Sequence, residues 1–269
     1  MQKSVSAPSK SKRKLLIFSL LAAGLCIALY AAIIINGYGI NSGSVFSLGL
    51  MWVPGFSALV SKLVVDHSIR GLGWKIHRQS LPCLGIAYLV PLVLCVVVYG
   101  LAWLTGLGRL QAMPLPQALT FATAGVLISC FASLGEEIGW RGFLLTELSQ
   151  LLPQKQVSLV IGIVWFLYHA PVIVFSNYNN GNIPCSLLCF FVMVMGFTFL
   201  VNALCLKAHS LWPAVLLHAS HNVFVQSIFD VATVNGPYTQ YLTSEFGIGL
   251  AAAYTAACVL YFHMEKKKL

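Results

Sequence analysis

The amino-acid sequence predicts an all-α fold, a polytopic transmembrane bundle of about eight spanning helices with both termini in the cytosol. Composition is the first observation: 58% of the 269 residues are hydrophobic and only 9% are charged, whereas soluble domains carry about 25% charged residues. The second is that long charge-free stretches alternate with short polar segments. A soluble fold could not bury so much apolar surface, so we expect a single transmembrane domain over residues 1–269.

The charge-free stretches divide the chain into eight expected helices. Gly, Asn and Pro concentrate between them, at 36–43, 106–116 and 176–184, and these residues end or interrupt helices. A basic polar loop at 67–80 and Pro153 supply two further boundaries. The helices are expected near residues 15–35, 45–65, 81–105, 117–150, 157–175, 185–205, 210–229 and 246–263.

The basic residues predict how these helices are oriented. Positive side chains favour cytosolic loops and flanks, so we place the N-terminus in the cytosol and interpret residues 1–14 as a basic cytosolic tail. The opposite side then receives only Arg109, with Asp230 and Glu245. The cytosolic side receives Lys3, Lys10, Lys12, Arg13, Lys14, Arg70, Lys75, Arg78, Lys155, Lys207, Lys266, Lys267 and Lys268.

The net charge of +9 indicates contact with a lipid bilayer and not with nucleic acid, because the basic runs flank apolar segments. The eight cysteines lie in or beside apolar stretches, and we interpret them as small buried hydrophobic residues. A first apolar run of about 20 residues is longer than a cleaved signal sequence requires. We therefore expect a multi-pass integral membrane protein, in the cytoplasmic membrane if bacterial or the endoplasmic reticulum if eukaryotic.

Ionisable side chains inside spanning helices are costly and are commonly functional. The first such group is Glu136, Glu137 and Arg141, expected at the cytosolic end of the fourth helix. Glu137 and Arg141 are four residues apart and can pair on one face, while Glu136 lies about 100° around the helix. Glu136 is therefore left for a partner elsewhere, unless the group is a solvated charge cluster at the interface.

Histidines supply two further groups. His169, in the fifth helix, is either a core histidine bonded to a carbonyl or a functional group. In the seventh helix His218 and Asn222 share one face, and His221 lies close to the same stripe; hydrogen bonding between helices is the alternative interpretation. Together, a carboxylate and imidazoles on three helices are the groups that activate water, which favours a hydrolytic site.

The order and spacing of these groups resemble the CAAX-protease and bacteriocin-processing (CPBP) family, which includes the type II CAAX prenyl endopeptidases. That family carries EExxxR, FxxxH and HxxxN on separate transmembrane helices. Residues 136–141 and 218–222 match the first and third motifs in full. The second differs, because Trp165 stands four residues before His169. An aromatic side chain is kept, so we expect the difference to affect packing more than chemistry. The resemblance covers about residues 117–230, the expected catalytic core.

The resemblance implies an intramembrane endopeptidase. Glu136 would be the general base that activates water together with His169, and His218 and Asn222 would stabilise the oxyanion. Donors held in a low-dielectric cavity suit that second role. The supporting residues on the same helices would be Glu137, Arg141 and His221.

The cofactor is left open by the resemblance. A catalytic zinc usually takes three protein ligands plus water, and Glu136, His169 and His218 would supply them if a zinc is present. The chain has no HExxH motif. A metal-free glutamate mechanism is compatible with the same residues, and we favour it.

Three classes of function fit these polar residues. The first is peptide-bond hydrolysis in the cytosolic half of the membrane, on a membrane-associated peptide or protein. The second is a non-catalytic immunity, scaffold or regulatory protein of the same family, which keeps the polar cluster to bind a partner. The third, a proton-coupled transporter, predicts paired discontinuous helices that the sequence does not suggest. Bacteriocin leader processing, surface-protein maturation and prenyl-protein trimming all remain open as reactions.

Overall fold

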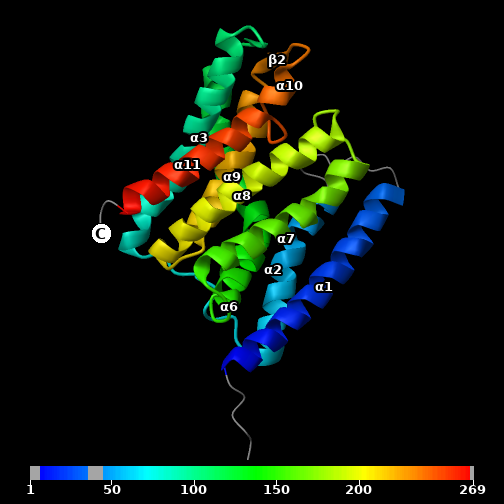
Figure 1. Ribbon diagram of the computed structural model, residues 1–269, viewed down its shortest axis with the longest axis vertical. Helices are drawn as coiled ribbons and strands as arrows, with labels where there is room; N and C mark the ends of the chain where they lie inside the picture. Colours follow the sequence, from blue (N-terminus) through cyan, green and yellow to red (C-terminus); the bar gives the residue numbers. More distant parts are fainter. Residues whose placement is uncertain (1–6, 36–44, 267–269) are drawn as a thin grey trace, which may run out of the picture.

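The computed structural model describes residues 7–35 and 45–266, and these residues form a bundle of long helices (Figure 1). The expected break at 36–43, together with Lys3, Lys267 and Lys268, lies outside the described residues. Elements of the bundle's first half are α1 (Ala7–Ile35), α2 (Val45–Asp66), η1 (Arg78–Ser80), α3 (Leu81–Leu104) and β1 (Gly108–Leu110). The fourth helix runs without a break through α4 (Leu115–Thr120), η2 (Phe121–Gly125), α5 (Val126–Glu137), η3 (Ile138–Leu144) and α6 (Leu145–Leu148).

The second half of the bundle also follows the expected order. It contains α7 (Gln154–Phe175), α8 (Ile183–Ala208), α9 (Trp212–Asn222) continued by η4 (Val223–Phe229), β2 (Thr233–Asn235), α10 (Thr239–Leu242) and α11 (Ile248–Lys266). Three of the segments, η2, η3 and η4, are π-helical. Such widened turns are frequent at functional sites, and η3 and η4 directly follow expected site residues, Glu137 and Asn222.

Seven helices among the described residues are long and apolar enough to cross a membrane. The remaining expected span, α9 with η4, is not one of them because His218, His221 and Asn222 lower its hydropathy. Most of its residues are nevertheless buried in the protein. The all-α polytopic prediction is confirmed, and the chain is a multi-pass integral membrane protein.

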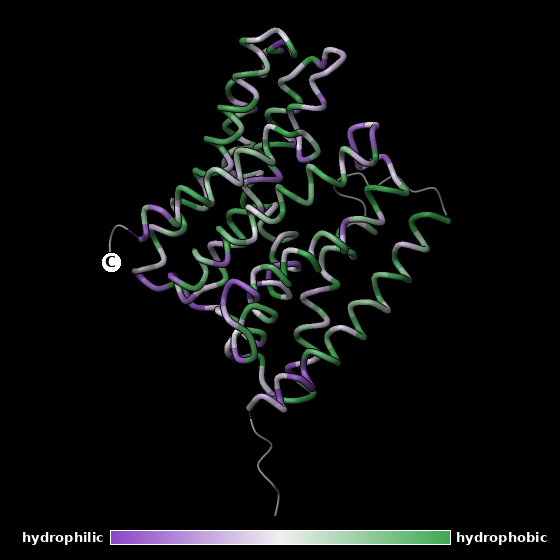
Figure 2. Tube along the Cα trace, viewed as in Figure 1, coloured by the Kyte–Doolittle hydropathy of each residue, from purple (hydrophilic) through white to green (hydrophobic). Residues whose placement is uncertain are grey.

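The connections gather at two opposite ends of the bundle. At one end Lys207 pairs with Glu265 at 3.0 Å, and the Leu211 amide donates to the Gly73 carbonyl at 3.0 Å. At the other end β1 and β2 pair as a short antiparallel ribbon. Figure 2 shows hydrophilic residues concentrated at these ends and hydrophobic residues along the helices. We refer to the first as the basic end, because the cytosolic set of basic loops lies there.

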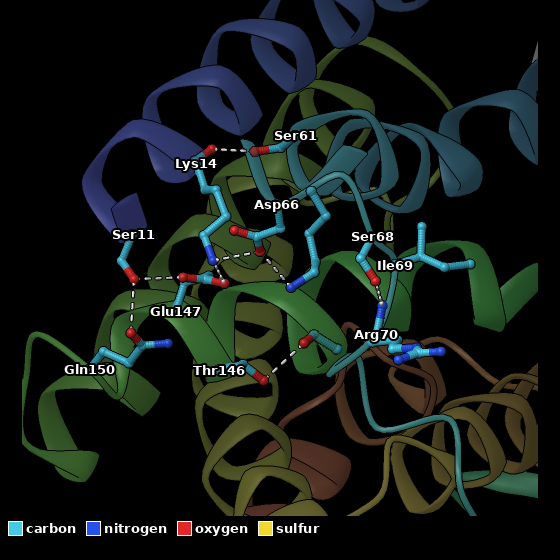
Figure 3. A network of polar contacts seen from close by, with 12 residues as sticks. Ser11, Lys14, Ser61, Asp66, Ser68, Ile69, Arg70, Thr146, Glu147 and Gln150 are labelled. Carbon is cyan, nitrogen blue, oxygen red and sulfur yellow. Dashed lines mark hydrogen bonds and ion pairs between the residues drawn. The ribbon is translucent and has the colours of Figure 1, made fainter. Parts of the chain in front are cut away.

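The first helix begins at Ala7, earlier than the expected start near residue 15. Two side chains of this extension are buried against α6, as Figure 3 shows. The Lys14 ammonium lies 2.6 Å from Glu147 and 2.9 Å from Asp66, and the Ser11 hydroxyl donates to Glu147 at 2.7 Å. Charge counting assigned Lys14 to solvent, whereas carboxylates from two other helices neutralise it inside the protein.

Close packing of α2 against α5 and η3 positions the fourth helix. A Cβ at Gly139 would lie 2.4 Å from Pro54 Cβ, and a Cβ at Gly135 would lie 2.7 Å from the Met51 carbonyl oxygen. Small residues let membrane helices approach at backbone distance. These two glycines flank Glu136 and Glu137, so the close approach brings the carboxylates into the bundle interior.

We predict that Gly139→Ala destabilises the protein by about 1–3 kcal/mol, the usual cost of overpacking. The matched control is Gly85→Ala on α3, where an added Cβ meets nothing within 4 Å. Thermal unfolding of the purified protein in detergent measures both. Equal unfolding temperatures for the two variants would contradict the close packing of α2.

Candidate active site

The structure brings four of the expected site residues to one cavity of about 760 Å³. Glu136 comes from α5, His169 from α7, and His218 and Asn222 from α9. Residues separated by more than 80 positions in the chain therefore face a common space. Three helices converge there, and a peptide-sized group can be enclosed by side chains from all of them.

Glu136 is 2% exposed and is held by two indole groups. Its Oε2 accepts hydrogen bonds from Trp140 Nε1 at 3.1 Å and from Trp165 Nε1 at 2.8 Å. The fourth helix continues to Leu148, so Glu136 lies about 18 Å from that helix end. The sequence predicted that Glu136 lies at the cytosolic end of the helix, whereas in the structure it lies deep in the bundle. The two donors fix one carboxylate oxygen and leave the other to the cavity.

Trp165 contacts Glu136, Arg141 and both histidines of the site. Its ring centroid lies 5.9 Å from that of His169 and 5.4 Å from that of His218. The guanidinium carbon of Arg141 lies 4.4 Å from the ring centroid. We expected this departure from the FxxxH pattern to affect packing, but Trp165 also donates a hydrogen bond to Glu136, which a phenylalanine cannot do.

His169 is half-buried, and its Nδ1 lies 3.0 Å from the Trp165 carbonyl oxygen. A carbonyl can only accept a hydrogen bond, so Nδ1 carries the proton and Nε2 of the neutral ring is an acceptor. His169 does bond a carbonyl of its own helix, and it also faces the cavity.

Glu137 is completely buried and links the first and third motifs. Both of its oxygens accept from Arg141 Nη1, at 3.0 and 2.9 Å, and its Oε1 also accepts from His218 Nδ1 at 2.9 Å. Arg141 is held further by Asn202 Oδ1 at 3.2 Å and Thr198 Oγ1 at 3.4 Å. The expected pairing of Glu137 and Arg141 is observed, and the same carboxylate fixes the ring of His218.

The two remaining residues of the third motif differ in position. Asn222 is half-buried and lines the cavity, and its side chain makes no hydrogen bond within the described part of the chain. His221 does not line the cavity. Its Nδ1 lies 2.9 Å from the Tyr254 hydroxyl and its Nε2 lies 3.6 Å from Glu245 Oε1. His221 therefore contacts α11 and the loop before it, and it does not face the cavity.

The cavity extends away from the basic end. Its outer part is lined by the start of α2, the segment after α7 and the loop before α11. Glu245 lies there, accepting from Gln226 Nε2 at 2.5 Å and from the Tyr178 hydroxyl. The sequence pattern placed Glu245 on the non-cytosolic side but gave it no role, because its partners come from other elements.

Acidic groups dominate the outer part of the cavity. Burial by itself would raise the pKa of Glu245, but His221, Tyr178 and Gln226 together lower it to about 2. Burial raises the pKa of Asp230 to about 6, against the hydrogen bond that Tyr99 donates to it. Both carboxylates are therefore mainly ionised at neutral pH. Within the described residues, no Lys or Arg lines this cavity.

The described side chains do not form a compact cluster of zinc ligands. Among the described residues, no group of three or more His, Cys, Asp or Glu side chains could hold a metal ion. The Nδ1 atoms of both histidines and Oε2 of Glu136 are bonded to protein groups, but metal-binding histidines show the same Nδ1 bonds and use the other ring nitrogen. The suggested set of Glu136, His169 and His218 shares a cavity without forming a tight ligand cluster.

We predict that Glu137→Gln destabilises the fold by about 3–5 kcal/mol, because it leaves the Arg141 charge buried without a counter-ion. The control is Glu265→Gln, which affects an exposed pair with Lys207 and should change stability by less than about 1 kcal/mol. Chemical unfolding in detergent compares them. Similar small losses for both would mean that Glu137 does not neutralise Arg141.

Comparison with models of protein families gives a match over part of the chain. Residues 118–224 match a family model described as Rce1-like, type II CAAX prenyl endopeptidase Rce1-like. No curated protein matches the chain. The matched segment contains Glu136, His169 and His218, and it lies inside the segment over which the motif resemblance was expected. At the level of the family, the match supports a CAAX-protease-like intramembrane peptidase. The part of the chain that carries the three polar motifs thus has the pattern of the Rce1-like type II CAAX prenyl endopeptidases.

Proposed function

We propose that this protein is an intramembrane endopeptidase, which hydrolyses a peptide bond of a membrane-associated substrate with a water activated by Glu136 and His169. One observation carries the proposal: Glu136, His169, His218 and Asn222 line a single cavity within the bundle. A carboxylate, an imidazole and two further polar donors are together the groups that hydrolysis of an amide requires.

The reaction follows from the hydrogen bonds of each group. Glu136 accepts a proton from the water, whose oxygen bonds to the carbonyl carbon of the substrate, and His169 Nε2 orients that water as an acceptor. Asn222 Nδ2 donates to the resulting oxyanion. When His218 is protonated, Nδ1 pairs with Glu137 and the Nε2 proton is free to donate as well. Collapse of the intermediate breaks the C–N bond, and Glu136 returns its proton to the leaving amine.

No step of this mechanism uses a metal. The carboxylate of Glu136 is oriented by Trp140 and Trp165, which places an acceptor at the cavity without any ligand bond. The rate increase then comes from general-base catalysis and from donors fixed in an enclosed site. We therefore favour the glutamate form of the mechanism over a zinc-dependent form.

The shape of the cavity indicates the side from which substrate enters. We expected hydrolysis in the cytosolic half of the membrane, but the cavity extends to the end opposite the basic loops. By the positive-inside rule that end is extracytoplasmic. Asp230 and Glu245 at its outer part favour a peptide that carries positive charge. Maturation of an exported or surface-displayed peptide fits this geometry better than trimming of a cytosolic prenylated protein.

The first test compares membrane peptides from cells that produce the wild type, Glu136→Gln or His169→Ala. We expect cleavage products with the wild type alone, because each substitution removes a group that binds the attacking water. Glu265→Gln is the matched control and should leave the products unchanged. A zinc chelator should also leave them unchanged.

Two outcomes would contradict the proposal. The same peptides from the wild type and Glu136→Gln, with both proteins inserted at equal levels, would favour a non-catalytic role for the polar cluster. Loss of products with chelator, restored by added zinc, would replace the metal-free mechanism.

The second test determines on which side of the membrane the cavity opens, with single added cysteines and a membrane-impermeant maleimide. Asn177→Cys lies at the outer part of the cavity, and Ser149→Cys lies exposed at the basic end. In intact cells we expect labelling above the wild-type background for Asn177→Cys only, with Ser149→Cys labelled after permeabilisation. The reverse pattern would contradict the proposed side of substrate entry without affecting the peptidase assignment.

A further inference from the structure

A second cavity, of about 880 Å³, lies at the basic end and is separate from the candidate active site. Three segments form it: the loop between α2 and η1, the η3–α6 part of the fourth helix, and the turn that joins α8 to α9. None of its lining residues lines the first cavity. We refer to it as the basic cavity.

The charges around the basic cavity are positive. Arg70, Lys75 and Arg141, which is already paired with Glu137, line it together with His77 and His209, and no Asp or Glu does so within the described residues. In the part of the chain that the structure describes, neither Arg70 nor Lys75 has an ion pair. The nearby carboxylates of Asp66 and Glu147 are engaged by Lys14 and Lys62. Figure 3 shows the Arg70 side chain apart from that network.

The backbone of the basic cavity is held firmly in place. The Gly73 carbonyl accepts from the Leu211 amide at 3.0 Å, and the Trp74 carbonyl accepts from Trp212 Nε1 at 2.8 Å. Gly73 has a φ of +78°, and a Cβ there would lie 2.9 Å from the Leu211 nitrogen. These contacts join the two loops, so the cations surround a space that exists before any ligand binds.

Apolar side chains lie beside the cations. Leu145 and Leu206 line the cavity, and Leu206 is 38% exposed. Ile69 and Ile76, in the same loop as Arg70 and Lys75, are 43% and 56% exposed. The cavity lies where the helices end, at the depth of lipid headgroups. A ligand with an anionic head and an apolar tail matches both sets of side chains, whereas a free anion matches only the cations.

We propose that the basic cavity binds the phosphate headgroup of an anionic phospholipid. Basic pockets between transmembrane helices on the cytoplasmic side are suited to such headgroups. Arg70 and Lys75 would contact the phosphate, while Leu206, Ile69 and Ile76 would lie along the acyl chains. The inner wall is formed by Leu145 and Thr146 of the fourth helix, so the bound lipid would rest against the helix that carries Glu136.

The test measures phosphatidylglycerol binding to the full-length protein in detergent by native mass spectrometry. We compare Arg70→Gln/Lys75→Gln with the charge-matched control Arg78→Gln/Lys155→Gln, whose exposed cations lie outside the cavity. We expect about 25-fold weaker binding for the first, since each basic residue near an anionic headgroup contributes about fivefold. The control should bind like the wild type. Single variants at positions 70 and 75 should each give part of the loss.

Further measurements distinguish a lipid headgroup from free inorganic phosphate as the ligand. Phosphatidylcholine, which has no net charge, should bind far more weakly than phosphatidylglycerol. Displacement of the lipid by millimolar inorganic phosphate would identify a free-anion site and overturn the lipid proposal. Equal loss in both double variants would mean general surface attraction, and unchanged binding in Arg70→Gln/Lys75→Gln would exclude the cavity. None of these measurements depends on peptidase activity.

Discussion

Burial of the Arg141 guanidinium in an apolar bundle is the constraint that organises the candidate site. A charge removed from water must be paired and hydrogen-bonded, or the fold loses several kcal/mol, roughly 3–5 when one partner is missing. Glu137 provides the counter-charge, and Asn202 and Thr198 satisfy remaining donors. Because Glu137 cannot move away from Arg141, the ring of His218 that it binds is fixed as well. A structural ion pair thereby sets the geometry of a group facing the cavity.

The adjacent carboxylate, Glu136, has a different environment although the two glutamates are consecutive in the chain. It lines the cavity and has indole donors in place of a cationic partner. Trp165 connects the two environments, since its ring covers Arg141 while its N–H holds Glu136. The helix thus directs Glu137 to the buried ion pair and Glu136 to the cavity. A rotation of about 100° per residue lets two consecutive side chains of one helix face different surroundings.

The two cavities give the ends of the molecule opposite electrostatic character. The site cavity is lined by Glu136, Asp230 and Glu245 and, in the described residues, by no Lys or Arg, whereas the basic cavity is lined by Lys and Arg without carboxylates. Both features agree with a membrane orientation in which the basic end meets anionic lipid and the acidic opening faces the other side. Substrate entry and lipid contact would then take place on separate faces of the bundle.

Hydropathy, charge and helical spacing are local properties, and from them the all-α class, the approximate spans, the basic end and the polar residues of the cavity could be predicted. The Glu137–Arg141 pair could be predicted as well, because it lies within one helix turn. Four features could not: Glu137 binds His218, Trp165 holds Glu136, Lys14 is buried, and the cavity extends away from the basic end. These outcomes depend on the rotation and separation of helices, which contacts such as Gly139 with Pro54 set and which no local pattern specifies.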